Sequence, residues 1–128
     1  MSLREKITEV ITKYLLNKEE IIFAYIFGSF EETENYNDID IAIYLESEFE
    51  QPQGYDLRLA VELETKLDKK IDIIIINQAS PSLIFEISKG KLLFDKDENL
   101  RTDFLTLNWK LYWDYKEKKM NLLRELYA

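Results

Sequence analysis

The chain has 128 residues, enough for one domain with a buried core and too few for two, and its 8 Tyr, 7 Phe and 2 Trp favour a packed globule. It contains no cysteine and no histidine, which excludes disulfides, thiol catalysis, serine-hydrolase triads and almost every transition-metal site. Without these residues, carboxylates are the groups that remain for catalysis or metal binding. The formal net charge of −8 argues against direct nucleic-acid binding.

The N-terminal part of the chain predicts one helix and two strands. Ser2 opens a capping-box pattern, and apolar residues at helical spacing then predict a helix over Leu3–Leu16. The apolar run Ile21–Phe27 predicts a buried strand that Gly28 closes, and a second strand is expected from Ile39 to about Leu45. No stretch resembles a secretory signal or a membrane span, so we expect a cytoplasmic protein without membrane contact.

The middle of the chain predicts a loop, a helix and a strand. A polar segment over Glu46–Gly54 is expected to be a loop, and apolar positions from Leu57 to Leu67 predict the next helix. The run Ile71–Ile76 is the most apolar segment and is expected to be a central strand, although Asp72 interrupts it. Three lysines are expected at the C-terminal end of the preceding helix, where the helix dipole favours cations: Lys66, Lys69 and Lys70.

The C-terminal part predicts a short helix, an extended piece and a long helix. Ser80 and Pro81 form an N-cap and first-turn pair, Gly90 is placed to end that helix, and Leu92–Phe94 is expected to be extended. From about Leu100 the pattern is helical to the end of the chain. The order of elements indicates an α/β fold with a single domain over residues 1–128. Four aromatic residues of the last helix are expected to pack mostly into the core: Trp109, Tyr112, Trp113 and Tyr115.

Asp38 and Asp40 open the second strand and carry the strongest chemical signal. A strand turns alternate side chains to opposite faces, so both aspartates should point one way. Asp72 is another single acid, and it lies near the start of the next predicted strand, as Asp38 and Asp40 do in theirs. If these two strands are neighbours, the three carboxylates converge on a site for Mg²⁺, which prefers oxygen ligands. The alternative is that each acid is a loop, cap or solvent-facing residue, as we expect for a second D-x-D pattern at Asp95 and Asp97.

Gly28 and Ser29 follow the first strand and allow two interpretations. Gly28 is either a tight-turn residue or a residue whose missing side chain lets backbone N–H groups approach a triphosphate. Ser29 is either a cap or a hydroxyl donor to the same phosphates. The position of this pair before the D-x-D strand favours phosphate binding.

Together these residues resemble the nucleotidyltransferase superfamily that includes DNA polymerase β. The resemblance implies a nucleotidyltransferase fold, with a small mixed sheet flanked by helices and a long C-terminal helix. It implies that Asp38 and Asp40 would hold two Mg²⁺ ions that bridge the nucleotide phosphates. Asp72 would complete the second metal site and help deprotonate the acceptor hydroxyl, while Gly28 and Ser29 would hold the β- and γ-phosphates.

From about Ile21 to Lys119 the sequence more closely resembles the minimal nucleotidyltransferase (MNT) antitoxins, which are partners of helical HEPN ribonuclease toxins. The segments that carry this resemblance are IDIIIINQASPSLIFEISKGKLLFDKDENLRTDF and LYWDYKEKK. The implied reaction transfers AMP from ATP to a tyrosine of the HEPN toxin and releases pyrophosphate.

The loop between Ser29 and Asp38 departs from the family pattern. It is slightly shorter than usual, and Glu32 and Thr33 replace an Arg and a Gly, so it stays open whether the acidic loop abolishes ATP binding. An alternative function is therefore a catalytically weak or inactive protein of this fold that neutralises a toxin by binding it. A third is a small-molecule nucleotidyltransferase of the aminoglycoside type, although those enzymes usually carry a second helical domain. A homodimer is also left open.

Overall fold

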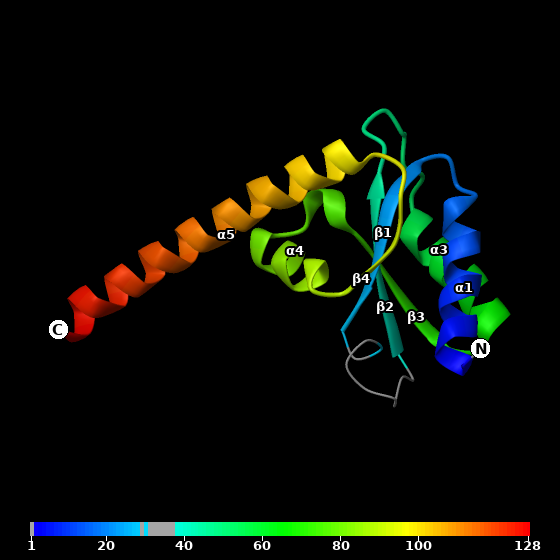
Figure 1. The fold of residues 1–128 in the computed structure, drawn as a ribbon, viewed down its shortest axis with the longest axis horizontal. Coiled ribbons are helices and arrows are strands. Elements are labelled where there is room, and N and C mark those ends of the chain that lie inside the picture. The colour runs from blue at the N-terminus through cyan, green and yellow to red at the C-terminus, as the bar shows by residue number, and fades with distance from the viewer. Residues whose placement is uncertain (1, 29, 31–37) are drawn as a thin grey trace.

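A computed structural model describes residues 2–28, 30 and 38–128 of the chain. Across this part, strands form one sheet in the order β3-β2-β1-β4 (Figure 1). Strands β2 and β3 run parallel, whereas β1 is antiparallel to both of its neighbours, so the sheet is mixed. The strand bounds are Ile21–Phe27 for β1, Asp38–Leu45 for β2, Lys70–Ile75 for β3 and Lys91–Asp95 for β4.

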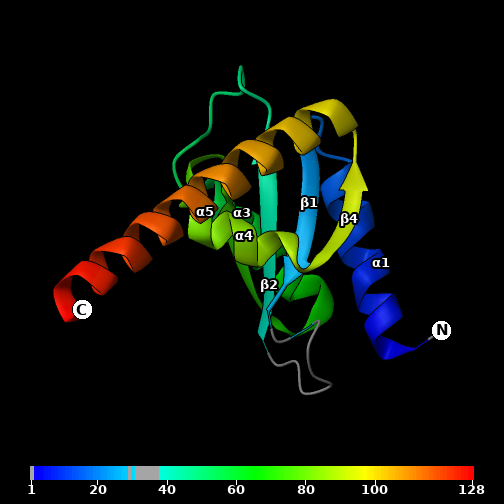
Figure 2. The ribbon, with the colours of Figure 1, turned by 60° about the vertical axis from the view of Figure 1, so that its left-hand side comes forward.

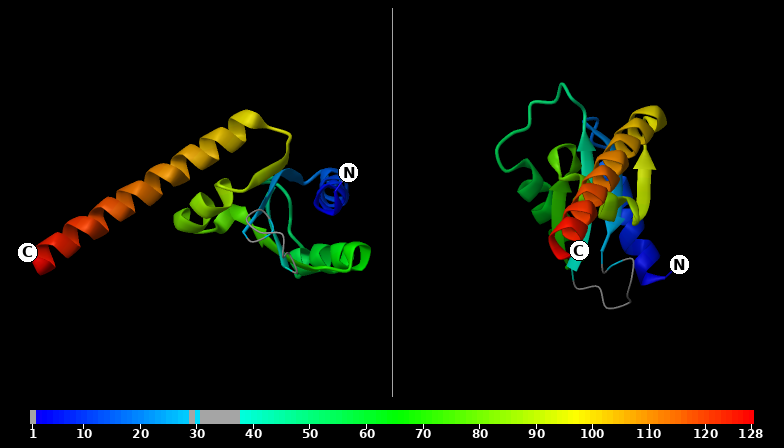
Figure 3. Two further views of the ribbon diagram at one scale, coloured as in Figure 1. Left: turned by 60° about the horizontal axis from the view of Figure 1, so that its bottom comes forward. Right: turned by 90° about the vertical axis from the view of Figure 1, so that its left-hand side faces the viewer.

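Helices cover both faces of the sheet (Figures 1 and 2). Helices α1 and α3 lie on one face, and helices α4 and α5 lie on the other, with α5 running past α4 and away from the sheet (Figure 3). This arrangement confirms the predicted α/β class, with a small mixed sheet flanked by helices and a long C-terminal helix. The helix bounds are Leu3–Leu16 for α1, Tyr55–Leu67 for α3, Pro81–Ser88 for α4 and Glu98–Tyr127 for α5.

The alternation of side chains along β2 divides the core into two parts. Ile39, Ile41 and Ile43 are fully buried and pack with residues of α1 and α3. Ala42 and the partly buried Tyr44 belong instead to a second cluster, which includes apolar residues of α4 and α5. Because side chains alternate, Asp38 and Asp40 lie on the same face of the sheet as Ala42, which is the face that α4 and α5 pack on.

Asn77 holds the far end of the pairing between β2 and the chain that follows β3. Its side-chain Nδ2 donates to the Leu45 carbonyl oxygen at 2.8 Å, and its Oδ1 accepts from the Leu45 N–H at 2.9 Å. This asparagine lies in a short 3₁₀ helix, η1 (Ile76–Gln78), yet its amide pairs as a strand backbone would. The two bonds help to fix the register of the parallel pair at the end opposite the aspartates.

The position of β3 in the sheet differs from the prediction. β3 is an edge strand among the described strands, not a central one, and the predicted last residue Ile76 belongs to η1. Its run of isoleucines reflects helices on both faces rather than strands on both sides, since Ile71 and Ile73 are buried with α3 and the partly buried Ile74 packs in the cluster that includes α4. An apolar run alone therefore cannot separate an edge strand from a central one.

The lysines near the end of α3 also lie differently from expectation. The helix ends at Leu67, and Asp68 is its C-cap in a left-handed conformation with φ 53°. Lys66 does lie in the last turn, as predicted. Lys70, in contrast, is the first residue of β3.

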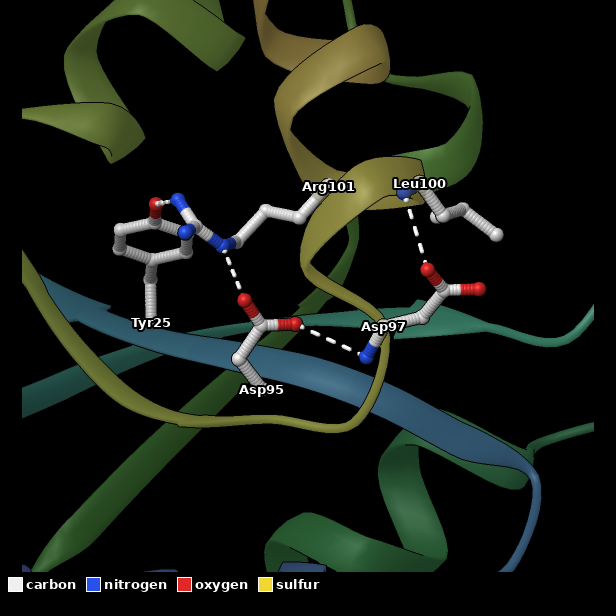
Figure 4. Close-up of polar contacts among 5 residues, drawn as sticks. All are labelled: Tyr25, Asp95, Asp97, Leu100 and Arg101. Carbon is white, nitrogen blue, oxygen red and sulfur yellow. Dashed lines mark hydrogen bonds and ion pairs between the residues drawn. The ribbon is translucent and has the colours of Figure 1, made fainter.

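A polar cluster fixes the start of α5 against the sheet (Figure 4). The Arg101 Nε donates to Asp95 Oδ2 at 2.6 Å, and its Nη1 lies 3.4 Å from the Tyr25 hydroxyl oxygen on β1. Asp97 caps the helix, because its Oδ1 accepts from the Leu100 N–H at 3.1 Å. The expected turn or cap position of the second D-x-D pattern is confirmed for Asp97, whereas Asp95 ends strand β4 and pairs with Arg101.

The C-terminal half of α5 is exposed, which contradicts the prediction that its aromatic residues lie mostly in the core. Trp109, Trp113 and Tyr115 are 40%, 51% and 64% exposed, whereas Tyr112 is partly buried and its ring stacks on Phe85 at 4.5 Å between centroids. The physical reason is direction, since α5 leaves the sheet after its first turns (Figure 3). Beyond the sheet it contacts only α4 among the described elements, through Phe85 and Ser88, which covers part of the aromatic side chains. No helix in the described part of the chain is both long enough and apolar enough to cross a bilayer.

Gly90 follows α4 for a packing reason that the helix-ending prediction did not include. A Cβ at this position would lie 2.2 Å from the Ile26 carbonyl oxygen and 2.8 Å from Phe27 Cβ. Its φ is not positive, so it is no left-handed cap. The missing side chain instead lets the chain between α4 and β4 pass directly against β1.

Replacing Gly90 with alanine should destabilise the protein by about 2 kcal/mol or more, because an added methyl group would overlap the backbone of β1. Gly54→Ala is the matched control: Gly54 has φ +74° but open space around it, so only backbone strain of about 1 kcal/mol is expected. Urea unfolding of both variants measures the difference. Equal losses would show that the close approach at Gly90 is unimportant.

Candidate active site

The parallel pairing of β2 and β3 places three carboxylates on one face of the sheet. Asp40 is the direct partner of Asp72, and Asp38 is the partner of Lys70. Neighbouring strands lie about 4.8 Å apart, and paired residues of a ladder point to the same face. The buried residues Ile39 and Ile71 point the other way. The structure therefore brings Asp38, Asp40 and Asp72 together; their role as catalytic residues and metal ligands remains a prediction.

The environment of Asp40 differs from that of the other two acids. Asp40 is half-buried, whereas Asp38 and Asp72 are exposed. Burial raises the pKa of Asp40 above its usual value, and repulsion from Asp72 and then from Asp38 raises it further. Like charges held close together favour any cation that would bind between them.

Gly28 lies against this carboxylate. The chain turns at Gly28 with φ +76°, one residue after the Phe27 that pairs with Asp40 across β1 and β2. A Cβ at position 28 would lie 2.7 Å from Asp40 Oδ2. Glycine is required here both by the left-handed backbone and by the space that the carboxylate occupies.

Parts of the predicted site lie outside the described residues. Ser29, the predicted phosphate donor, is one of them, and the acidic residues Glu31, Glu32 and Glu34 are others. Phe30 is described, and it is fully buried in the cluster beneath α1.

The donor chemistry fits Mg²⁺. Asp38, Asp40 and Asp72 offer only hard carboxylate oxygens, and the missing side chain at Gly28 lets Asp40 Oδ2 lie close against the backbone turn. Among the described residues, no three acidic side chains lie close enough together to hold a metal ion by themselves. The three aspartates would supply some of the oxygen ligands of a cation. Its other ligands would be water and phosphate oxygens, which Mg²⁺ commonly binds.

Lys70 is a residue at this site that the sequence interpretation placed wrongly. It is exposed, begins β3 and pairs with Asp38. The alternation of Lys70, Ile71 and Asp72 could have revealed it, because period 2 puts Lys70 and Asp72 on one face. The lysines before it favoured a helix end instead.

The fold and site define an α/β protein with a mixed sheet and a candidate active site made of carboxylates. Two of these acids begin β2, and the third lies beside them on β3. A sequence model of the family described as "Polymerase beta, Nucleotidyltransferase" matches residues 9–99, more than half of the chain. The chain belongs to the polymerase β nucleotidyltransferase family. No curated protein matches it significantly in sequence.

Solved structures share this fold over nearly the whole chain. One is a tri-AMPylated Shewanella oneidensis HEPN toxin in complex with an MNT antitoxin, at TM-score 0.74 and 22% identity, covering 98% of this chain and 100% of that one. A toxin–antitoxin structure with AMP-PNP gives 0.75 and 24%, covering 94% and 98%. An MntA–HepT structure gives 0.72 and 22%, covering 97% and 99%. These likenesses confirm the predicted nucleotidyltransferase fold.

Replacing Asp40 with asparagine should stabilise the metal-free protein at pH 7. Because the pKa of folded Asp40 is raised, its ionised form lowers stability as pH rises from the unfolded to the folded pKa. The gain should be at most about 1 kcal/mol, since the group is half-exposed, and should vanish in acid.

Thermal unfolding across a pH series measures this effect. Asp103→Asn, at an exposed position on α5, is the control and should change little. A fall in stability on Asp40→Asn at pH 7 would contradict the repulsion argument.

Proposed function

We propose that this protein is a Mg²⁺-dependent nucleotidyltransferase that transfers AMP from ATP to a tyrosine of a HEPN-type toxin partner and so acts as an antitoxin. The observation that carries the proposal is the register that sets Asp40 beside Asp72 and Asp38 on one face, in a chain of the polymerase β nucleotidyltransferase family. The similar structures include a HEPN toxin that is tri-AMPylated and a toxin–antitoxin structure with AMP-PNP.

The roles of the residues follow from their positions. Asp38 and Asp40 would bind two Mg²⁺ ions together with the nucleotide phosphates, and Asp72 would complete the second metal site. Bound Mg²⁺ would supply neutralisation of charge on the phosphate oxygens. Gly28 leaves its backbone accessible beside Asp40, and Ser29 would add a hydroxyl donor.

The proposed reaction balances as an in-line displacement. The oxygen of the tyrosyl hydroxyl attacks the α-phosphorus of ATP, and Asp72 accepts the proton of that hydroxyl. A new oxygen–phosphorus bond forms, the bond to the β-phosphate oxygen breaks, and pyrophosphate leaves. The products are a tyrosyl-AMP ester and pyrophosphate.

The single domain over residues 1–128, the cytoplasmic location and the absence of direct nucleic-acid binding are part of this proposal. Two features support the first: α4 and α5 share one core cluster with β1 and β2, and β1 and β2 also contribute to the cluster beneath α1 and α3.

Radiolabelled ATP, Mg²⁺ and the partner toxin test the activity directly. Label should move to the toxin, and Asp38→Asn, Asp40→Asn or Asp72→Asn should each lower the rate by at least about a hundredfold, because each removes a charge from the reaction centre. Asp103→Asn makes the same chemical change on α5 and should leave the rate unchanged. Transfer that survives both Asp38→Asn and Asp40→Asn would remove the assignment.

The exposed apolar side of α5 favours a second candidate function, neutralisation by binding alone. Leu107, Leu111, Tyr115, Leu122 and Leu126 recur at helical spacing, and each is 46% to 65% exposed. A stripe of this size on one chain marks a protein interface. Both candidate functions need a protein partner, and we propose that α5 from Leu107 onward binds the toxin.

Leu122→Glu combined with Leu126→Glu should weaken toxin binding by at least about tenfold, because two charges would enter an apolar interface. Lys110→Gln, on the polar side of the same helix, should bind normally. Surface plasmon resonance with immobilised toxin measures both variants, and circular dichroism checks their fold. Unchanged affinity of the double variant would rule out this surface.

Cell protection separates the two candidate functions. The Asp38→Asn, Asp40→Asn double variant should fold and bind the toxin but fail to protect cells if AMP transfer neutralises the toxin. Protection by that variant would favour neutralisation through binding alone.

A further inference from the structure

Lys70 places a cation at the edge of the carboxylate site. It is the first residue of β3, and its Cα is paired with that of Asp38. Ile71 is 5% exposed and belongs to the core beneath α3, so Lys70 and Asp72 both turn to the opposite face. Since Asp38, Asp40 and Asp72 occupy that face, the side chain of Lys70 leaves its strand on the same face and at the same end of the sheet.

This lysine has no partner among the described residues. Lys13 pairs with Glu9, Lys89 pairs with Glu86, and Lys96 donates to the carbonyl oxygen of Lys18. The side chain of Lys70 forms no ion pair or hydrogen bond within the described part of the chain. An exposed lysine on a flexible stem, next to three acids and not committed to any of them, can turn toward a ligand.

The charge balance of the site calls for such a cation. Three carboxylates converge in a chain of net charge −8, and a nucleoside triphosphate brings about four more negative charges, of which metal ions offset only a part. In the loop after Gly28, glutamate stands where the family resemblance leads us to expect arginine. A basic group on the strand beside Asp38 would offset part of this phosphate charge.

We propose that Lys70 binds the β- and γ-phosphate oxygens of the nucleotide and then the pyrophosphate that leaves. This inference rests on the proposed function, because it assumes a nucleotide at Asp38, Asp40 and Asp72. Lys70 is a point charge for the phosphate tail and makes no contact with the adenosine part. Its contribution is therefore specific to ligands that carry a β-phosphate.

Titration calorimetry with Mg²⁺–ATP, Mg²⁺–pyrophosphate and AMP tests this assignment. Lys70→Gln should weaken binding of ATP and of pyrophosphate by about tenfold, because it removes a charge-assisted hydrogen bond. Binding of AMP, which has no β-phosphate, should stay within about twofold. Lys70→Arg, which keeps the charge, should restore most of the affinity. Raising the salt concentration should weaken ATP binding less in Lys70→Gln than in the wild type.

Two controls keep the interpretation specific. Lys110→Gln removes the same charge from the exposed side of α5 and should bind all three ligands as the wild type does, which separates a local effect from a change in net charge. Thermal unfolding of Lys70→Gln should match the wild type, because the side chain is exposed and unpaired among the described residues.

The outcomes separate this inference from the proposed function. If Lys70→Gln binds ATP and pyrophosphate like the wild type while Asp40→Asn does not transfer label, the role of Lys70 is overturned and the proposed function stands. Equal weakening of all three ligands, or of Lys110→Gln alongside, would also overturn it. Failure of the wild type to bind Mg²⁺–ATP or Mg²⁺–pyrophosphate would overturn both.

Discussion

The parallel register between β2 and β3 is the constraint on which the rest of the structure depends. In this register Ile39, Ile41 and Ile71 all enter the core beneath α1 and α3, while Asp40 and Asp72 share the opposite face. A slip of β3 by one residue would exchange these faces and bury Asp72 among isoleucines. The apolar pattern that stabilises the sheet is therefore the same pattern that assembles the carboxylates, and stability and site geometry cannot be varied independently.

The sequence predicted the elements better than their partners. The capping box at Ser2 and the periodicity after it gave the observed bounds of α1, and the run before Gly28 gave those of β1. These features depend on neighbours along the chain, which the sequence displays directly. The pairing of β2 with β3, the edge position of β3 and the placement of Lys70 depend on contacts across the sheet. Asp38, Asp40 and Asp72 could be named in advance, but their convergence could be stated only as a condition.

The errors share one physical cause. Apolar content indicates that a residue will be covered and does not tell what covers it. For Ile71 and Ile73, coverage comes from a helix rather than from a second neighbouring strand. Trp113 and Tyr115 stay 51% and 64% exposed, because the sheet does not reach them and α4 covers only part of Trp113, although the sequence pattern favoured a place in the core. In the same way Gly90, whose position after α4 matches a helix end, is required by the backbone of β1.

Helix α5 is fixed to the sheet at its N-terminal end, and its C-terminal half is exposed. Arg101, Asp95 and the cap at Asp97 fix its first turn to the sheet that carries the carboxylates, and from there it extends as a straight rod. A rod held in this way sets a distance, since each residue adds about 1.5 Å of reach. A protein bound near Leu122 would lie well away from the aspartates. Its modified residue would therefore have to lie on a segment long enough to reach back to the sheet. The length of α5 would then select among acceptor residues by how far each one reaches.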